Sequence, residues 1–390
     1  MANLKKFKSN PFEYARELDA AELVDREDEL DAVVRTIRDG GKLFLIGPRR
    51  YGKTTILKAA GERAAREGMI ALRYNAEAWP SLGEMLQRMV TDAAQSLAAP
   101  NVKARQKLRE IFGRLEPKFT FDLEGKVSAT IGAKSETEPG HLPLIVDALN
   151  GIEALAARSE SPVGLILDEF QKIIEVGGES AEGQIRAAVQ QHRHLGYIFA
   201  GSKTRMLTEM TTHASRPFYR LGERIFLGPI PEEPFLAFLN RAFKKTGIAV
   251  EAGASESILA LAEEVPYNVQ RLAHDAWEYL AKAGKATLTV ADVKAALELI
   301  LRRDDPFYTQ LWNPFSPQQK KALTAVIQMK GLGLLSKQSL KLAGLPNSTM
   351  QQAIKALKDK EILREEEKLG QKVARFEDPF FAAWITMITS

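Results

Sequence analysis

Short, largely apolar runs alternate with amphipathic segments along the first 230 residues. The runs predict five strands, at 42–46, 69–74, 163–167, 197–200 and 224–227. Between them apolar residues recur at helical spacing, as at Leu30, Val33, Val34 and Ile37. Strands that alternate with helices are typical of a parallel sheet with helices on both faces. The pattern therefore predicts an α/β fold for this part of the chain.

A different period interrupts this pattern at about 117–135. Phe119, Phe121 and Leu123 alternate with polar residues, and the alternation resumes after Glu124-Gly125. A period of two on both sides of a turn predicts a β-hairpin inserted before the next helix. The sequence does not show whether this hairpin is a contact surface or a plain insertion.

The strand pattern ends at Pro231, and the rest of the chain divides into two parts. Helical spacing predicts four helices, at about 232–245, 255–264, 268–283 and 290–303, and then a linker rich in proline and aromatic residues. Two capping boxes are predicted to open helices, at Ser316 and at Ser348. A short helix at 337–342 lies between them, and two strands around Gly370 come after, which is the order of a winged helix. The predicted domains are 1–230, 231–312 and 313–390.

Composition sets limits on the class of protein. The chain of 390 residues is 45% hydrophobic and 27% charged, as ordinary globular proteins are, and it has no cysteine. Disulfides, thiolate metal sites and cysteine nucleophiles are therefore excluded, and a reducing cytoplasm is expected. The longest apolar stretch, Phe380–Ile388, is too short to span a membrane. The early lysines are not followed by the apolar core of a secretory signal.

Positive charge gathers toward the C-terminus. The formal net charge is +4, but residues 315–390 hold 12 Lys and Arg against 7 Asp and Glu. The excess predicts an anionic partner for this segment, and duplex DNA is one candidate.

The strongest chemical signal comes after the first predicted strand and precedes a helix. It has the spacing G-x-x-x-x-G-K-T and consists of Gly47, Pro48, Arg49, Arg50, Tyr51, Gly52, Lys53, Thr54 and Thr55. In this context it predicts a phosphate-binding P-loop, in which backbone N–H groups and the helix N-terminus surround phosphates. Side chains at the two glycines would keep the backbone from a phosphate. Lys53 is expected to neutralise the β- and γ-phosphates, and Thr54 to bind Mg²⁺.

A second signal lies at the end of the third strand, where Leu165-Ile166-Leu167 runs into Asp168-Glu169. This segment resembles a Walker B motif. Asp168 is expected to hold Mg²⁺, and Glu169 to orient and polarise an attacking water. Ser202 comes directly after the fourth strand, where its hydroxyl could meet the γ-phosphate or the water, or could cap the next helix.

These motifs, with others in the same order along nearly the whole chain, resemble the archaeal-type AAA+/STAND ATPases. The matching segments are NPFEYA, LVDREDEL, LFLIGPRRYGKTTI, LILDEFQKI, FAGSKTRM, SRPFYRLGERIFLGPI, EEVPYNVQRLA and RFEDPFFAAWI. The resemblance implies an AAA+ core, a helical lid and a winged helix. It also implies that residues 10–26, Arg26 included, contact adenine.

The resemblance assigns further residues by position. Ser202 matches the sensor-1 position, and Arg216, Arg220 and Arg224 lie where an arginine can reach the γ-phosphate of a neighbouring subunit; we select Arg220. Pro266 matches the lid motif, and Arg271 is a candidate sensor-2 residue, with a plain helix-surface role as the alternative. The glycine usual in that lid motif is replaced by Glu264.

The function expected is an ATP-binding and ATP-hydrolysing molecular switch in which ATP, ADP and Mg²⁺ control the lid and the winged helix. One alternative is a DNA-binding AAA+ ATPase, similar to origin-recognition proteins or transposition regulators, that contacts duplex DNA through residues 315–390. Another is a nucleotide-responsive scaffold with negligible hydrolysis, against which Lys53, Asp168 and Glu169 argue. Self-association and a protein partner both stay open.

Overall fold

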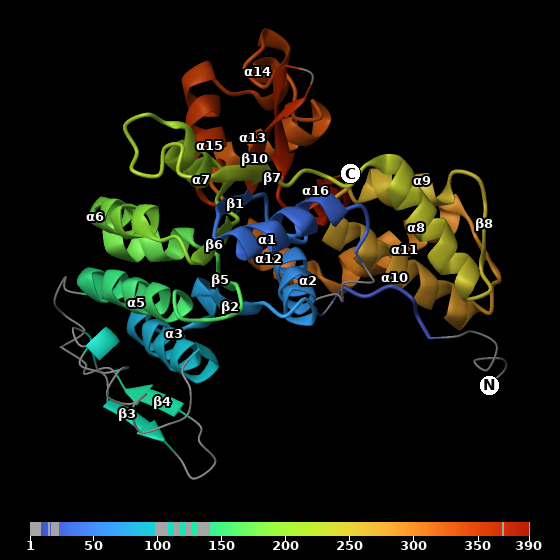
Figure 1. Ribbon diagram of the computed structural model, residues 1–390. Coiled ribbons are helices and arrows are strands. Elements are labelled where there is room, and N and C mark those ends of the chain that lie inside the picture. The colour runs from blue at the N-terminus through green and yellow to red at the C-terminus, as the bar shows by residue number, and fades with distance from the viewer. Residues whose placement is uncertain are drawn as a thin grey trace. The chain divides into compact units, whose positions relative to one another are not determined.

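A computed structural model of the chain describes residues 9–14, 16, 23–97, 108, 110–112, 115, 118–121, 127–130, 141–368 and 370–389. Contacts divide the chain into two compact units (Figure 1). The first unit is residues 17–228, and the second joins residues 1–16 to residues 229–390.

The first unit is built on a five-stranded parallel sheet, as the apolar runs predict. Its strands are β1 (Lys42–Ile46), β2 (Ile70–Asn75), β5 (Val163–Asp168), β6 (Leu195–Gly201) and β7 (Glu223–Phe226). Their order in the sheet is β2-β5-β6-β1-β7, and every neighbouring pair is parallel. The carboxyl ends of β1, β5 and β6 therefore meet at one edge of the sheet.

Helices cover both faces of this sheet. One face carries α1 (Glu27–Asp39) and α2 (Lys53–Arg66), and the other carries α3 (Leu82–Leu97), α5 (His141–Ala156), α6 (Gln171–Gln191) and α7 (Thr204–Thr212). Helix α1 approaches the strands closely: a Cβ added at Gly164 of β5 would lie only 2.5 Å from the Ile37 side chain of α1. The opposite face packs around stacked rings, with the centroids of Phe44 and Phe199 5.0 Å apart. A short 3-10 helix, Ala76–Ala78, comes after β2.

The predicted hairpin is present within the described residues. Strands β3 (Lys118–Phe121) and β4 (Val127–Thr130) pair antiparallel, with Phe119 opposite Ala129. The Ala129 amide donates to the Thr91 hydroxyl on α3 at 3.1 Å. The hairpin is thus held against α3; the rest of the predicted range, including Ile131, lies outside the described residues.

Helices dominate the second unit. They begin with α8 (Glu232–Lys245), α9 (Ala254–Leu261), α10 (Pro266–Ala283), α11 (Val290–Arg303) and α12 (Asp305–Trp312). A short parallel ladder joins β8 (Ala249–Val250) to β9 (Thr287–Leu288). The expectation of a plain linker after α11 is wrong where α12 forms. Pro306 lies in the first turn of α12, where a helix needs no backbone N–H donor.

The last part of this unit, residues 315–389, is here called the C-terminal module. It comprises α13 (Pro317–Gln328), α14 (Lys337–Ala343), α15 (Asn347–Asp359), β10 (Leu363–Lys368), β11 (Gln371–Phe376) and α16 (Pro379–Thr389). Three helices followed by an antiparallel hairpin is the predicted winged-helix order. Ser316 forms its capping box with Gln319. The box predicted at Ser348 is absent, because α15 already begins at Asn347, with Pro346 as the preceding cap residue.

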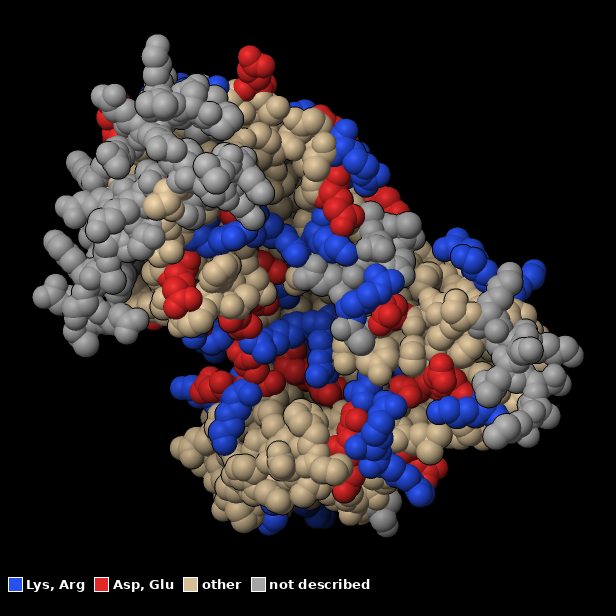
Figure 2. All heavy atoms as spheres, turned by 90° about the horizontal axis from the view of Figure 1, so that it is seen from below, with Lys and Arg blue, Asp and Glu red and all other residues tan. Residues whose placement is uncertain are grey.

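Charges in the hairpin of this module are locally balanced. Glu365 pairs with Lys358 of α15 and with Lys372 of β11, and Glu366 pairs with Arg364 at 2.7 Å. The Glu367 side chain lies outside the described residues. On the face shown in Figure 2, basic and acidic side chains are likewise interspersed rather than gathered by sign.

Candidate nucleotide-binding site

The predicted P-loop connects β1 to α2, and its two glycines serve different purposes. Gly52 has a φ of 87° and is the cap residue before α2. No atom lies within 4 Å of a Cβ built there, so the backbone conformation is what requires glycine. At Gly47 a Cβ would lie 2.7 Å from the Leu227 Cβ. Packing against Leu227 therefore requires glycine at position 47. The sequence had indicated a different reason, the close approach of the backbone to a phosphate.

Lys53 is the first residue of α2, and its side chain is held inside the loop. It is 4% exposed, and its Nζ donates to the carbonyl oxygens of Gly47 and Pro48, each at 2.8 Å. The ammonium therefore lies at the N-terminus of α2, where the helix dipole also favours an anion. Of the other loop residues Tyr51 is buried, whereas Arg49 is exposed and pairs with Glu77. Arg50 is exposed, and Thr55 is partly buried.

Thr54 and Asp168, which the sequence predicts to bind the same Mg²⁺ ion, lie next to each other in the structure. The Thr54 hydroxyl donates to Asp168 Oδ2 at 2.9 Å. Asp168 is 1% exposed, and this burial raises the pKa of its carboxyl, with a further rise from the charge of Glu169. A hydroxyl and one carboxylate are hard oxygen donors of the kind that Mg²⁺ takes together with nucleotide phosphates. The two side chains therefore fit the ion that the motif implies.

Glu169 comes next, in a strained backbone conformation with a φ of 51°. Its Oε2 accepts from the Ser202 hydroxyl at 2.8 Å, from the Ser202 amide at 3.2 Å and from Gln171 Nε2. Burial acts to raise the pKa of Glu169, but the Gln171 bond, the Lys53 charge and the Ser202 bonds outweigh it and lower the pKa. Glu169 is therefore held as a carboxylate.

Ser202 and Gln171 show what the sequence left open and what it missed. Ser202 does not cap α7, whose cap residue is Lys203; its hydroxyl is bonded to Glu169 instead. Gln171 was not a predicted site residue. The sequence feature that could have identified Gln171 is its position two residues after Glu169, in the segment Asp168-Glu169-Phe170-Gln171.

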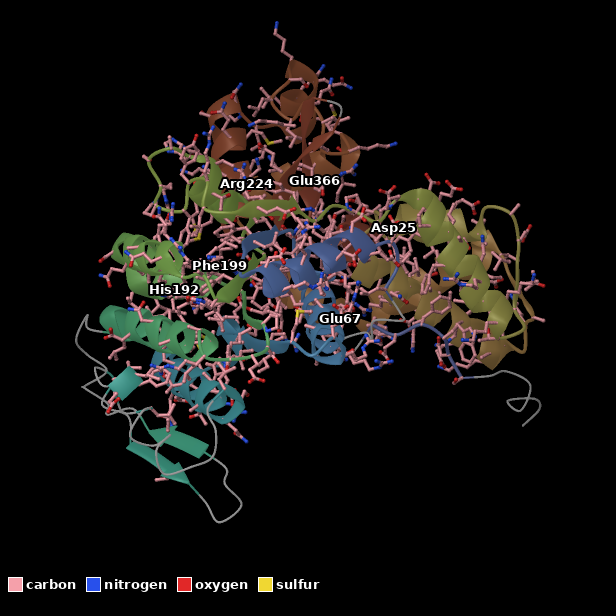
Figure 3. The ribbon with its side chains drawn as sticks, viewed as in Figure 1. Asp25, Glu67, His192, Phe199, Arg224 and Glu366 are labelled. Carbon is pink, nitrogen blue, oxygen red and sulfur yellow. The ribbon has the colours of Figure 1, made fainter. Side chains whose placement is uncertain are left out.

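Several predicted arginines contact their own unit. Arg26 is 6% exposed and donates to Glu29 at 2.9 Å and to the Gly228 carbonyl oxygen. Arg216 pairs with the buried Glu182 of α6. Arg224, labelled in Figure 3, donates to the Thr211 carbonyl oxygen at 3.2 Å. Arg220 is exposed, has a φ of 55° and lies over the Tyr219 ring.

The predicted lid residues belong to the second unit. Pro266 is the first residue of α10, and the preceding Glu263 and Glu264 have left-handed φ values of 47° and 60°. Glu264 thus adopts the conformation that favours the glycine expected at its position. Arg271 is not on the helix surface: it pairs with Asp304, and its guanidinium lies 5.9 Å from the Tyr14 and Phe380 rings.

The N-terminal segment, expected to contact adenine, also packs within the second unit. Phe12 is 2% exposed, and its ring centroid lies 4.6 Å from that of Phe243 on α8. Asn10 donates to the His274 carbonyl oxygen on α10. This segment therefore links the beginning of the chain to two helices of the second unit.

Two further findings concern the described residues as a whole. No group of three or more His, Cys, Asp or Glu could hold a metal ion there, whereas an Mg²⁺ site that relies on phosphate oxygens needs no such group. None of the helices within the described ranges combines the length and apolar character that a membrane crossing requires.

The parallel sheet, the loop that wraps Lys53 and the acidic pair after β5 define an α/β fold of the P-loop type. Comparison of the sequence with protein-family models and with curated proteins finds no match. Solved structures do match. A Walker-type ATPase of Pyrococcus abyssi has a TM-score of 0.62 at 16% identity, over 96% of this chain and 99% of that one.

The ORC2 protein of Aeropyrum pernix, solved as ADPNP–ADP complexes, has a TM-score of 0.54 at 15% identity, over 98% of both chains. Its ADP form has a TM-score of 0.52 at 15% identity, over 99% of this chain and 100% of that one. At these identities the likeness is one of fold, and it extends over nearly the whole chain.

Proposed function

We propose that this protein binds and hydrolyses Mg-ATP and uses the nucleotide state to control the position of its C-terminal module. The observation that carries the proposal is the convergence of Lys53, Thr54, Asp168 and Glu169 at the carboxyl edge of one parallel sheet. The fold shared with a Walker-type ATPase supports it. The lack of cysteine also fits a cytoplasmic protein.

Each of these side chains has a task in hydrolysis. The Lys53 ammonium would exchange its bonds to the Gly47 and Pro48 carbonyls for phosphate oxygens. Thr54 and Asp168 would hold Mg²⁺, which when bound neutralises charge on the phosphates. Glu169 would accept a hydrogen bond from the attacking water and so orient it.

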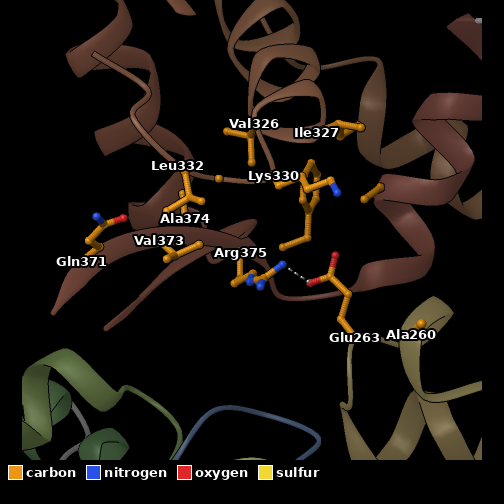
Figure 4. A pocket seen from close by; sticks show the side chains of 13 residues that line it. Ala260, Glu263, Val326, Ile327, Lys330, Leu332, Gln371, Val373, Ala374 and Arg375 are labelled. Carbon is orange, nitrogen blue, oxygen red and sulfur yellow. Dashed lines mark hydrogen bonds and ion pairs between the residues drawn. The ribbon is translucent and has the colours of Figure 1, made fainter. Parts of the chain in front are cut away.

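Contacts in the second unit support a link from the lid to the C-terminal module. Arg375 of β11 lies 3.5 Å from Glu263, beside a cavity of about 620 Å³ (Figure 4). Asp378 accepts from the fully buried Asn268 of α10 at 3.0 Å and from the Tyr308 hydroxyl of α12 at 3.2 Å. We call these contacts the clasp. A change at the start of α10, near Pro266, would be passed through the clasp to the module.

Nucleotide binding is tested by titrating ATP with and without Mg²⁺. Lys53→Ala should lower affinity at least tenfold, whereas Lys58→Ala, a change of the same type later in α2, should leave it unchanged. Glu169→Gln should bind ATP but keep only a small, measurable residual turnover. Undiminished binding by the Lys53 variant, or a parent protein with no Mg²⁺-dependent affinity for adenine nucleotides, would contradict the proposal.

The switch is tested by small-angle scattering with ADP and with a slowly hydrolysed ATP analogue. We expect the two profiles to differ in the parent protein. Asp378→Ala removes the carboxylate shared by Asn268 and Tyr308, so it should change that difference while ATP affinity stays the same. Lys372→Ala, at an 80% exposed side chain, is the control. Identical profiles with both nucleotides would exclude a large movement.

A second candidate function is duplex DNA binding by the C-terminal module. Helix α15 exposes Asn347, Ser348, Gln351, Gln352 and Lys355, which are types that contact phosphates and base edges. The hairpin carboxylates Glu365 and Glu366 are paired with basic side chains, which reduces their repulsion of a phosphate backbone. The observation that favours DNA binding is this pairing of Glu365 and Glu366 with basic side chains.

Fluorescence anisotropy with labelled duplex DNA at several salt concentrations tests this second function on the full chain. Lys355→Ala should weaken binding and reduce the salt slope by about 1. Lys294→Ala, an exposed lysine of α11, controls for lost charge. An absence of binding at low salt would contradict this second function.

A further inference from the structure

We infer that Gln171 is a positioning residue for ATP hydrolysis: it holds one oxygen of the Glu169 carboxylate and leaves the other to the attacking water. The inference rests on the proposed hydrolysis and assigns a role to a residue outside the Walker motifs. Gln171 is the first residue of α6, and its side chain lies against the end of β6.

The hydrogen bonds to Glu169 all converge on one atom. Gln171 Nε2, the Ser202 hydroxyl and the Ser202 amide each donate to Oε2, and Gln171 Nε2 also lies 3.4 Å from the Ser202 oxygen. None of the described residues donates to Oε1 of Glu169. The carboxylate is therefore fixed in rotation, with one oxygen occupied and the other able to accept from water.

The protein keeps Gln171 in place at a cost in unsatisfied hydrogen bonding. Gln171 is 1% exposed, and its Oε1 is buried without a hydrogen-bond partner among the described residues. A buried amide oxygen without a partner destabilises the folded state. The amide cannot turn over, because a carboxylate only accepts, and the Nε2 side must face Glu169.

Gly201 provides the space that this side chain needs. A Cβ at Gly201 would lie 2.1 Å from Gln171 Oε1 and 2.6 Å from Leu207. At the end of β6, Gly201 thus leaves room for the Gln171 amide because it has no side chain. The next residue, Ser202, donates to the same Glu169 oxygen as Gln171. These two features of β6 and the first residue of α6 together determine where the Glu169 carboxylate points.

The test is the steady-state ATPase of Gln171→Leu, which keeps the approximate volume and removes both amide atoms. We expect kcat to fall about 10- to 100-fold, as a misplaced catalytic group does, with KM and ATP affinity unchanged. Thermal stability should be retained or raised, because the orphaned oxygen is gone. Gln190→Leu, at an exposed position of the same helix, is the matched control.

A double-mutant cycle shows whether Gln171 acts through Glu169. In a Glu169→Gln background, Gln171→Leu should have no further effect on turnover, because the carboxylate it positions is absent. An equal fold-loss in both backgrounds would overturn the inference. So would a Gln171→Leu variant with the kcat of the parent.

The outcomes separate this inference from the proposed function. A parent protein without Mg-ATP turnover contradicts the proposed function itself. An active parent whose turnover needs Glu169 but not Gln171 contradicts only the positioning role. If Gln171→Leu does not fold, Gln171→Asn keeps an amide with shorter reach, and it should show the same loss in kcat at constant KM.

Discussion

The buried guanidinium of Arg26 donates to the carbonyl oxygen of Gly228, a residue 202 positions away in the chain. Arg26 also donates to Glu29 at 2.9 Å. The residue before α1 is thereby joined to the segment after β7. This relationship gives the arginine of the segment LVDREDEL a structural task, whereas the resemblance implied a contact with adenine.

Replacing Arg26 should therefore destabilise the protein. Arg26→Met leaves the Gly228 carbonyl and the Glu29 carboxylate without their donor, and we expect a loss of about 2 to 4 kcal/mol in unfolding free energy. Arg35→Met removes an ion pair whose side chains are 54% and 50% exposed, and should cost at most about 1 kcal/mol. Urea unfolding measures both. Equal effects would show that burial of Arg26 does not matter.

Gly47→Ala should destabilise the protein even without nucleotide. The added Cβ would meet Leu227 at 2.7 Å, so we expect a loss of about 1 to 3 kcal/mol. Gly61→Ala, inside α2, would place its Cβ 3.8 Å from Ala71, an ordinary contact, and should gain up to about 1 kcal/mol from helix propensity. Thermal unfolding of nucleotide-free protein compares the two. A Gly47 variant as stable as the parent would mean that the segment after β7 shifts freely.

Stability should depend on pH through His192, which is labelled in Figure 3. Its ring bonds to the Tyr197 hydroxyl at 2.7 Å and to Asn150 at 2.9 Å. Burial lowers the pKa of His192, the Lys42 charge lowers it further, and the Glu153 charge opposes both.

Because the folded state binds the proton more weakly, the contribution of His192 is complete above its unfolded pKa of about 6.5 and is lost as pH falls from there through the folded pKa. Urea unfolding between pH 5 and 8 should show this decline in the parent, and a smaller decline in His192→Gln. His213→Gln, at an exposed histidine, controls for the substitution. A parent whose stability rises toward pH 5 would contradict the sign.

Glu264→Gly should stabilise the second unit. Glu264 has a φ of 60°, a conformation that costs an ordinary residue about 1 kcal/mol and costs glycine almost nothing. Part of that gain is offset by the greater freedom of glycine in the unfolded chain. We expect a net gain of about 0.5 kcal/mol, whereas Glu298→Gly, inside α11, should lose about 1 kcal/mol. A loss of similar size in both variants would show that the Glu264 backbone is unstrained.

Local sequence was sufficient for much of the fold and for the centre of the site. The run 42–46, followed by the spacing from Gly47 to Thr54, predicted a strand, a loop and a helix that the structure contains. Asp168 was predicted from a continuous apolar run that ends in a carboxylate pair, and it contacts Thr54. These features can be predicted from sequence because a buried strand and the P-loop spacing are each defined by residues adjacent in the chain.

Side-chain partners were not readable in the same way. Whether Ser202 caps α7 or bonds to Glu169 depends on the distance between β5 and β6, which share no local sequence. Arg216 is bonded to Glu182 of α6, a partner 34 residues away. Ser348 failed as a cap because α15 begins one residue before it.

The sequence by itself determined where the strands run, where the loop from Gly47 to Thr54 lies and which carboxylates come after a buried strand, since each depends on the order of residues over one element. Only the tertiary structure decided that Gly47 packs against Leu227 and that Arg26 donates to the Gly228 carbonyl oxygen. It also decided that Gln171 and Ser202 donate to the same oxygen of Glu169. Those contacts depend on strand order and on how closely the elements pack. They therefore exist only once segments far apart in the chain have come together.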